Sequence, residues 1–336
     1  MNKPSVSIII PVYNVGPYAE DCIRSVMRQT YDGKMECIIV DDCGTDESME
    51  IVGKVIADYN GSITFNILHH THNRGLSAAR NTGMDAATGD YLFFLDSDDE
   101  LTDDCIDKLV KPLELEWYDI VVGNTRKIDT VRNVVFKKNY LKIPDNTLLR
   151  PDMILKTLMN RDWMIAAWNK LYNKDFISGN QLYFQEGIIF EDIFWTFQIA
   201  CLSTSLYAVN QITYIYKNRK ESIMGTACIE TRADSYSVNV IEMVKFAKNH
   251  NQYNESVHEL IQEYIYEILK LNSFTLFNHS YRQIRKYAKL TICKLKKVNG
   301  NNIKRYFRDF HYLIPVLVAS YWQYYIYYRI RKIFAK

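Results

Sequence analysis

Short, nearly continuous apolar runs alternate with stretches of helical periodicity along the first 95 residues. Apolar runs of about five residues that are rich in β-branched side chains are typical of strands buried on both faces of a sheet. In the intervening stretches apolar residues recur every three or four positions, which is the spacing of one helix face. The pattern predicts strands at Val6–Ile10, Glu36–Val40, Thr64–Leu68 and Tyr91–Leu95, and helices at Pro17–Gln29, Ser48–Tyr59 and Leu76–Ala87.

This alternation of strand and helix predicts an α/β domain with a mostly parallel sheet and helices on both faces. In such sheets ligands bind beyond the carboxyl ends of the strands. Polar clusters follow three of the four strands, namely Tyr13-Asn14, Asp41-Asp42 and the run from Asp96 to Asp99. We therefore expect a ligand site at this edge of the sheet.

Beyond about residue 125 the periodicity weakens. Residues 230–311 predict mainly helix with a basic face. We divide the chain into a main domain, 1–225, a basic helical region, 226–311, and a C-terminal helix, 312–336. The later part of the main domain predicts a strand pair at Val131–Tyr140, helices at Asp152–Met159 and Phe190–Cys201, and a strand at Leu206–Lys217.

Composition is that of an ordinary globular protein, with 48% hydrophobic and 24% charged residues among 336. The apolar run Val6–Val12 is too short for a signal peptide, so we interpret it as a strand. The seven cysteines are scattered and never form a CxxC pair. This disfavours a disulfide framework or a zinc site and favours a reducing compartment, the cytoplasm. They are Cys22, Cys37, Cys43, Cys105, Cys201, Cys228 and Cys293.

The net charge of +2 is unevenly distributed along the chain. Residues 1–270 hold 27 basic and 38 acidic side chains, whereas residues 271–336 hold 14 basic side chains and one acidic side chain. Residues 312–328 carry no charge but include Pro315 and several Tyr, which prefer the membrane interface. We expect this helix, with the basic residues from Arg282 to Arg308, to lie on the inner face of the cytoplasmic membrane. The alternative is a helix packed on the main domain. Nucleic-acid binding is not expected, since no sequence motif for it accompanies the basic tail.

The run Asp96-Ser97-Asp98-Asp99 needs a physical explanation, because adjacent carboxylates repel one another unless a cation or hydrogen-bond donors compensate them. Carboxylate oxygens suit Mg²⁺ or Mn²⁺, which usually take one or two protein carboxylates together with substrate phosphates. The alternative is a solvated acidic turn that caps a helix beginning near Thr102.

Four blocks together resemble the inverting glycosyltransferase family 2, which has the GT-A fold. The resemblance implies a GT-A domain with a helical C-terminal extension. It also implies metal-dependent transfer of a sugar from a nucleotide donor, UDP-linked by preference. The acceptor would be a hydroxyl of a glycan or lipid-linked molecule in cell-surface or capsular polysaccharide synthesis. The blocks are Val6–Asn14, Ile39–Asp46, Asn73–Gly83 and Gly89–Asp99, in family order and spacing.

The resemblance also implies roles at the nucleotide end of the site. Tyr13 would stack on the nucleobase beside Pro11, although a strand-end aromatic can simply cover the core. Asp42 would accept a hydrogen bond from the uracil N–H, with Asp41 beside it as a helper or a turn residue. Arg80 would lie near the base or the phosphates, the alternative being a charge on a helix surface.

At the reacting end, Asp96 and Asp98 resemble the family's DxD motif, which contacts ribose and metal, and Asp99 is expected to share the metal. Arg219 lies in a stretch similar to one whose basic groups approach the diphosphate, and a solvated basic loop is the alternative. We also expect Trp168–Tyr172 to line the acceptor cleft, unless Trp168 and Leu171 merely pack in the core.

An inverting transferase needs a carboxylate that removes the proton of the acceptor hydroxyl. Glu191-Asp192 resembles the family's ED motif at a helix start, and Asp192 is the predicted base. An acidic helix N-cap is the alternative for this pair.

Two other classes of protein fit the sequence less well. A nucleotidyltransferase usually carries a Gly-rich basic loop after its first strand, where this chain has Pro11–Asn14. A non-catalytic nucleotide-sugar-binding scaffold at the membrane has no need of both the DxD motif and Asp192.

Overall fold

The structure, a computed structural model, describes residues 3–130, 132, 134–136, 140–218, 228–250 and 264. The chain divides into two compact units, which are described separately. The first is Met1–Gly187 with Glu191–Gly225, and the second is Ile188–Phe190 with Thr226–Lys336. Among the described residues no helix is both long and apolar enough to cross a membrane. The predicted C-terminal helix, 312–336, and most of the basic helical region lie outside the described residues.

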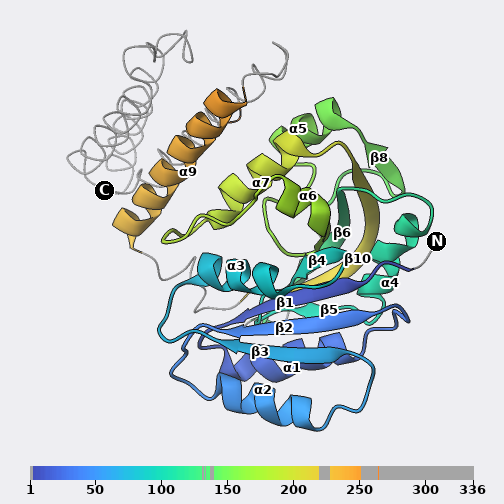
Figure 1. Cartoon of the computed structure of the whole chain (residues 1–336), viewed down its shortest axis with the longest axis vertical. Helices are drawn as coiled ribbons and strands as arrows, with labels where there is room; N and C mark the ends of the chain where they lie inside the picture. Colours follow the sequence, from blue (N-terminus) through green and yellow to red (C-terminus); the bar gives the residue numbers. More distant parts are fainter. Residues whose placement is uncertain are drawn as a thin grey trace, which may run out of the picture. The chain divides into compact units, whose positions relative to one another are not determined.

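The first unit is built on one mixed sheet, in which the strands follow the order β3-β2-β1-β4-β9-β6-β10-β5, with β7 on β6 and β8 on β10. Figure 1 shows helix α3 (Leu76–Ala86) on one face and helices α1 (Gly16–Met27) and α2 (Ser48–Ala57) on the other. The strands are β1 (Val6–Val12), β2 (Met35–Asp41), β3 (Thr64–His69), β4 (Tyr91–Phe94), β5 (Glu100–Leu101), β6 (Ile120–Asp129), β7 (Val134–Phe136), β8 (Thr147–Leu149), β9 (Lys170–Asn173) and β10 (Leu206–Asn218).

Central strand β1 explains why two helix layers are needed, because all seven of its residues are buried. Ile8 and Ile10 belong to the hydrophobic core on the side of α1 and α2. Ile9 points to the other face, where α3 packs so closely that a Cβ on Gly83 would lie 2.4 Å from the Ile9 Cγ2 atom. A larger residue at Gly83 would push α3 away from the sheet. The glycine therefore determines how closely α3 packs on the sheet.

The N-terminal half confirms the predicted α/β pattern, since β1 pairs in parallel with both β2 and β4, and β2 with β3. The second half departs from it because β9 is inserted antiparallel between β4 and β6. Of the strand pair predicted within Val131–Tyr140, the described residues form one strand, β7. Its partner is the earlier strand β6, which lies before the predicted range.

The predicted helices at Asp152–Met159 and Phe190–Cys201 are confirmed as α5 and α7, with boundary shifts of about one residue. The helix expected near Thr102 begins at Cys105 as α4. The remaining helices of the first unit are α4 (Cys105–Val110), the 3₁₀ turn η1 (Lys111–Glu114), α5 (Pro151–Met159), α6 (Lys174–Gly179) and α7 (Glu191–Leu202).

The second unit, in its described part, consists of helix α9 (Ile229–Asn249) and the short segment Ile188–Phe190. Ser235 and Asn239 of α9 hold this segment through hydrogen bonds to the backbone of Ile189 (3.1 Å) and of Phe190 (3.1 Å). The rings of Phe190 and Tyr236 lie 4.7 Å apart.

Candidate active site

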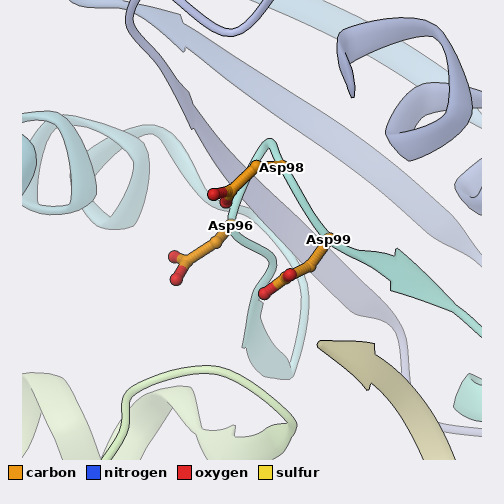
Figure 2. Close-up of side chains that lie close together, drawn as sticks. All are labelled: Asp96, Asp98 and Asp99. Carbon is orange, nitrogen blue, oxygen red and sulfur yellow. The ribbon is translucent and has the colours of Figure 1, made fainter. Parts of the chain in front are cut away.

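The acidic run after β4 lies at the carboxyl edge of the parallel strands, as expected. Asp96, Asp98 and Asp99 each offer a carboxylate oxygen, and these oxygens lie within 4.8 Å of one another. Figure 2 shows the three side chains on one tight turn between β4 and β5. The turn is closed by a hydrogen bond from the Asp99 amide to the Asp96 carbonyl, 3.0 Å. The three carboxylates of this turn therefore form one cluster of hard oxygen ligands.

Asp99 is the buried member of this cluster. Its carboxylate accepts hydrogen bonds from the Tyr214 hydroxyl (2.8 Å) and from the Lys217 amide (2.7 Å), both on β10. Desolvation, followed by the charges of Asp98 and Asp96, raises the pKa of Asp99 well above its ordinary value. A divalent cation fits this donor set, because it would relieve the mutual repulsion of the carboxylates.

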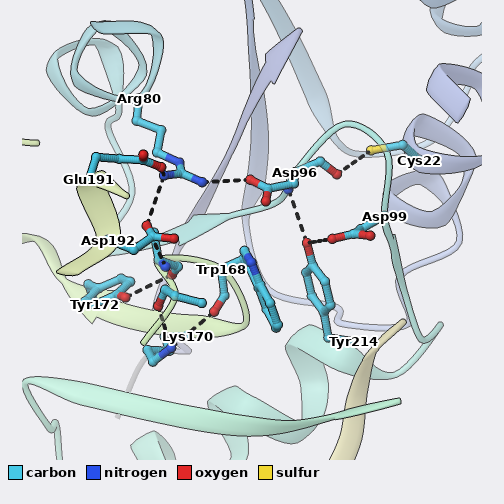
Figure 3. Close-up of polar contacts among 12 residues, drawn as sticks. Cys22, Arg80, Asp96, Asp99, Trp168, Lys170, Tyr172, Glu191, Asp192 and Tyr214 are labelled. Atoms are coloured by element: carbon cyan, nitrogen blue, oxygen red, sulfur yellow. Dashed lines mark hydrogen bonds and ion pairs between the residues drawn. The ribbon is translucent and has the colours of Figure 1, made fainter. Parts of the chain in front are cut away.

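Arg80 joins the cluster to a second pair of carboxylates, as Figure 3 shows. Its side chain is 0% exposed, and its Nη2 atom donates to Asp96 at 2.8 Å. Its Nη1 atom donates to Glu191 at 2.7 Å and to Asp192 at 3.1 Å. Burial alone lowers the pKa of Arg80, but the three carboxylates outweigh it and hold the pKa above its ordinary value.

The alternative of a surface charge for Arg80 is therefore wrong. The guanidinium is a buried bridge between Asp96, 16 positions further along the chain, and Asp192, 112 positions further along. A role of Arg80 toward the base or phosphates of a donor stays a prediction.

Asp192 lies in the first turn of α7, and its side chain is 21% exposed. Besides Arg80, its Oδ1 atom accepts a hydrogen bond from the amide of Ala167 at 3.1 Å. Desolvation raises the pKa of Asp192 to about 7, although Arg80 acts to lower it. A carboxylate with a pKa near neutrality has the basicity that a general base requires.

Lys170 lies in the stretch that the sequence assigned to the acceptor cleft, but its role in holding the segment beside Asp192 was not predicted. Its fully buried ammonium donates to the carbonyls of Ala166 (2.7 Å) and Trp168 (3.3 Å). The Tyr172 hydroxyl donates to the carbonyl of Ala167 at 2.9 Å. These bonds fix the three-residue segment whose Ala167 amide contacts Asp192. Desolvation lowers the pKa of Lys170 to about 7, and the charge of Asp192 opposes this.

The only signal for Lys170 in the sequence is its place in the stretch Trp168–Tyr172, between two aromatic residues. The expectation that this stretch lines an acceptor cleft is not supported for Trp168 and Leu171, which are buried. Trp168 stacks on Tyr214 with ring centroids 4.5 Å apart. The packing alternative holds for both residues, because Leu171 on strand β9 and Trp168 just before it belong to the hydrophobic core.

Tyr13 and Asp42 lie where β1 and β2 end. The Tyr13 side chain is 46% exposed, so its ring is available to a planar ligand. Asp42 is only 2% exposed, and its carboxylate accepts from the amides of Arg74 (2.8 Å) and Gly75 (2.8 Å). It also contacts His70 Nδ1 at 2.7 Å. Asp42 therefore shapes the loop that enters α3.

The remaining predicted residues are placed as follows. Asp41 accepts from the Cys43 amide (3.0 Å) and contacts His69 Nδ1 (2.9 Å). Pro11 is buried within β1, where it pairs with Val40. Arg219 lies outside the described residues. The ligand roles of these three residues stay predictions.

The mixed sheet, with an acidic cluster beyond its parallel strands, agrees with the GT-A fold that the sequence implied. The sequence profile described as "Glycosyl transferase family 2" matches residues 7–178. The chain belongs to this family.

Relatives and solved structures agree with this assignment. The chain is 32% identical over 223 residues to glycosyltransferase GlyA of Streptococcus pneumoniae, a match that covers 65% of this chain and 31% of GlyA. The chain thus spans about a third of that relative. TarS 1–349 of S. aureus, solved with UDP-GlcNAc, superposes with a TM-score of 0.72 at 19% identity, over 97% of this chain and 91% of that 1–349 chain. The Pyrobaculum calidifontis mannosyltransferase PcManGT, solved with GDP-Man and Mn²⁺, gives 0.57 at 16% identity over 96% and 88%.

Proposed function

We propose that the protein transfers a sugar from a nucleotide-diphosphate donor, a UDP-sugar by preference, to a hydroxyl of a glycan or lipid-linked acceptor. The product would belong to a cell-surface or capsular polysaccharide. The observation that carries this proposal is the Arg80 bridge. The same guanidinium donates hydrogen bonds to the desolvated carboxylate of Asp192 and to Asp96 of the acidic cluster. Such an arrangement supplies a base for one reactant and a cation site for the other.

Asp192 removes the proton of the acceptor hydroxyl as its oxygen attacks the anomeric carbon of the donor sugar. The bond from that carbon to the diphosphate breaks on the opposite side, so the configuration inverts. The Ala167 amide and Arg80 hold the Asp192 carboxylate in one orientation. Asp96, Asp98 and Asp99 would hold a Mn²⁺ or Mg²⁺ ion. When bound, such an ion neutralises charge on the diphosphate.

The preference for a UDP-sugar draws on the nucleotide end of the site and on the fold relative. The half-exposed ring of Tyr13 can stack on a base at the end of β1. TarS, which shares the fold, is solved with UDP-GlcNAc. We also propose a peripheral location at the inner face of the cytoplasmic membrane. This part rests on the C-terminal sequence, in which an uncharged stretch, 312–328, lies between two basic segments.

A donor-hydrolysis screen tests the proposed function. UDP- and GDP-sugars are incubated with the full chain, with and without Mn²⁺, and released nucleoside diphosphate is measured. We expect turnover of at least one UDP-sugar only with the metal. Asp98→Ala should lower this rate at least about a hundredfold, because a metal contributes several kcal/mol to stabilising the leaving group.

Asp58→Ala is the matched control, since Asp58 is an exposed carboxylate at the end of α2. It should behave like the parent chain. If no donor is turned over with metal, or if the Asp98 and Asp58 variants are equally active, the proposed function is incorrect.

The pH dependence of transfer gives an independent check of the base. Because Asp192 acts in its ionised form and its pKa is raised to about 7, kcat/KM should increase with pH through neutrality. We expect about a tenfold increase between pH 6 and pH 8 and a plateau above that. A profile that is already level at pH 6 would mean that the base has an ordinary carboxylate pKa.

A further inference from the structure

A polar cleft of about 470 Å³ lies beside α3, outside the residues assigned to donor and base. One wall is the α3 face that carries Asn81 and Asp85, together with Arg74 just before the helix. The other wall is the segment Tyr183–Glu186. The volume falls in the range of roughly 300–1,000 Å³ that is usual for small-molecule sites.

Hydrogen bonds between the two walls hold the cleft in shape. The buried side-chain amide of Asn81 both accepts from the Phe184 amide (2.9 Å) and donates to the Phe184 carbonyl (3.0 Å). The Tyr183 hydroxyl donates to Asp85 at 3.0 Å. Arg74 and Glu186 form an ion pair at 3.4 Å. A ligand would therefore meet preformed walls and would not have to order them.

The chemistry of the walls suits a polyhydroxylated, neutral ligand. The Tyr183 side chain is 51% exposed, while its tethered hydroxyl fixes the direction of the ring. An aromatic face of this kind can cover the C–H face of a sugar ring. Asp85, Gln185 and Glu186 offer acceptors and donors for sugar hydroxyls. The carboxylates of Glu186 and Asp85 compensate the positive charge of Arg74. The walls therefore do not favour a phosphate or a nucleic acid.

The cleft is connected to the active site through α3. Arg80 donates to Asp192, and the next residue, Asn81, binds the segment that lines the cleft. Helix α3 therefore contributes one residue that orients the base and the next residue to the wall of the cleft.

We propose that this cleft is a saccharide-binding subsite that holds the acceptor chain at a distance from its reacting hydroxyl. The proposal rests on the proposed function, since it supplies the acceptor for that transfer. It identifies the acceptor as a carbohydrate several units long, with its inner units against Tyr183.

Direct binding measurements test the subsite. Isothermal titration of the full chain uses chitohexaose, cellohexaose and mannohexaose, each beside its monosaccharide. We expect at least one hexasaccharide to bind more tightly than its monosaccharide, and Tyr183→Ala to weaken that binding by at least about tenfold, as for a truncated aromatic anchor. Tyr183→Phe keeps the ring and should retain most of the affinity.

Trp117→Ala removes an exposed aromatic residue elsewhere and should bind like the parent chain. If Tyr183→Ala binds as the parent does, or if the parent binds none of the hexasaccharides, the subsite is ruled out. Donor hydrolysis in the absence of acceptor separates the two proposals. The rate of donor hydrolysis in the Tyr183→Ala variant should equal that of the parent chain. If the parent chain itself hydrolyses no donor, that result contradicts the proposed function and not the saccharide binding.

Discussion

Replacing Asp192 by Asn is expected to lower the rate of sugar transfer by about 10²–10⁴-fold, the usual contribution of a general base. Asn has nearly the same shape as Asp but cannot accept the proton of the acceptor hydroxyl. Its side-chain oxygen can still accept from the Ala167 amide and from Arg80, so the local structure should persist. The loss should therefore fall on kcat, with little change in the affinity for the nucleotide-sugar.

Steady-state transfer kinetics, together with titration of the donor in the presence of Mn²⁺, distinguish these quantities. Glu191→Gln is the matched control, because Glu191 is a neighbouring carboxylate that binds the same guanidinium at 2.7 Å. It should lose much less activity than Asp192→Asn. Equal losses in the two variants would show that the base has not been identified, and a larger loss for Glu191→Gln would transfer the role to Glu191.

Replacing Arg80 by Met should have the largest effect on stability. The fully buried guanidinium compensates the carboxylates of Asp96, Glu191 and Asp192. Removing one partner of a buried ion pair leaves uncompensated charge in the interior and costs about 3–5 kcal/mol. We expect a loss of this size in the free energy of unfolding, measured by urea denaturation, and loss of transfer activity as well.

Arg80→Lys should recover only part of the stability, because an ammonium cannot reproduce the fork that donates to carboxylates on two sides. Arg24→Met is the control, since Arg24 pairs with Glu20 at the surface, where such a pair contributes about 0–1 kcal/mol. If Arg80→Met unfolds at the same urea concentration as Arg24→Met, the bridge does not stabilise the fold.

Much of the parallel half of the sheet could be predicted, because each strand is a local apolar run and each helix a local periodicity. Strand β9 could not be predicted from the sequence, because it is only four residues long and contains the basic residue Lys170. It becomes a strand by pairing with β4 and β6, which lie about 80 and 50 residues earlier in the chain. Such pairing depends on the assembled sheet and leaves no periodic signal in the sequence.

The sequence by itself determined the class of fold, the edge of the sheet that carries the site and the acidic run from Asp96 to Asp99. These follow from patterns within a few neighbouring residues. Only the tertiary structure decided that Arg80 is buried between that run and Asp192, and that Lys170 fixes the segment that contacts the base. Burial and desolvation arise when distant segments pack together, and they set the charge state on which the chemistry of Asp192 depends.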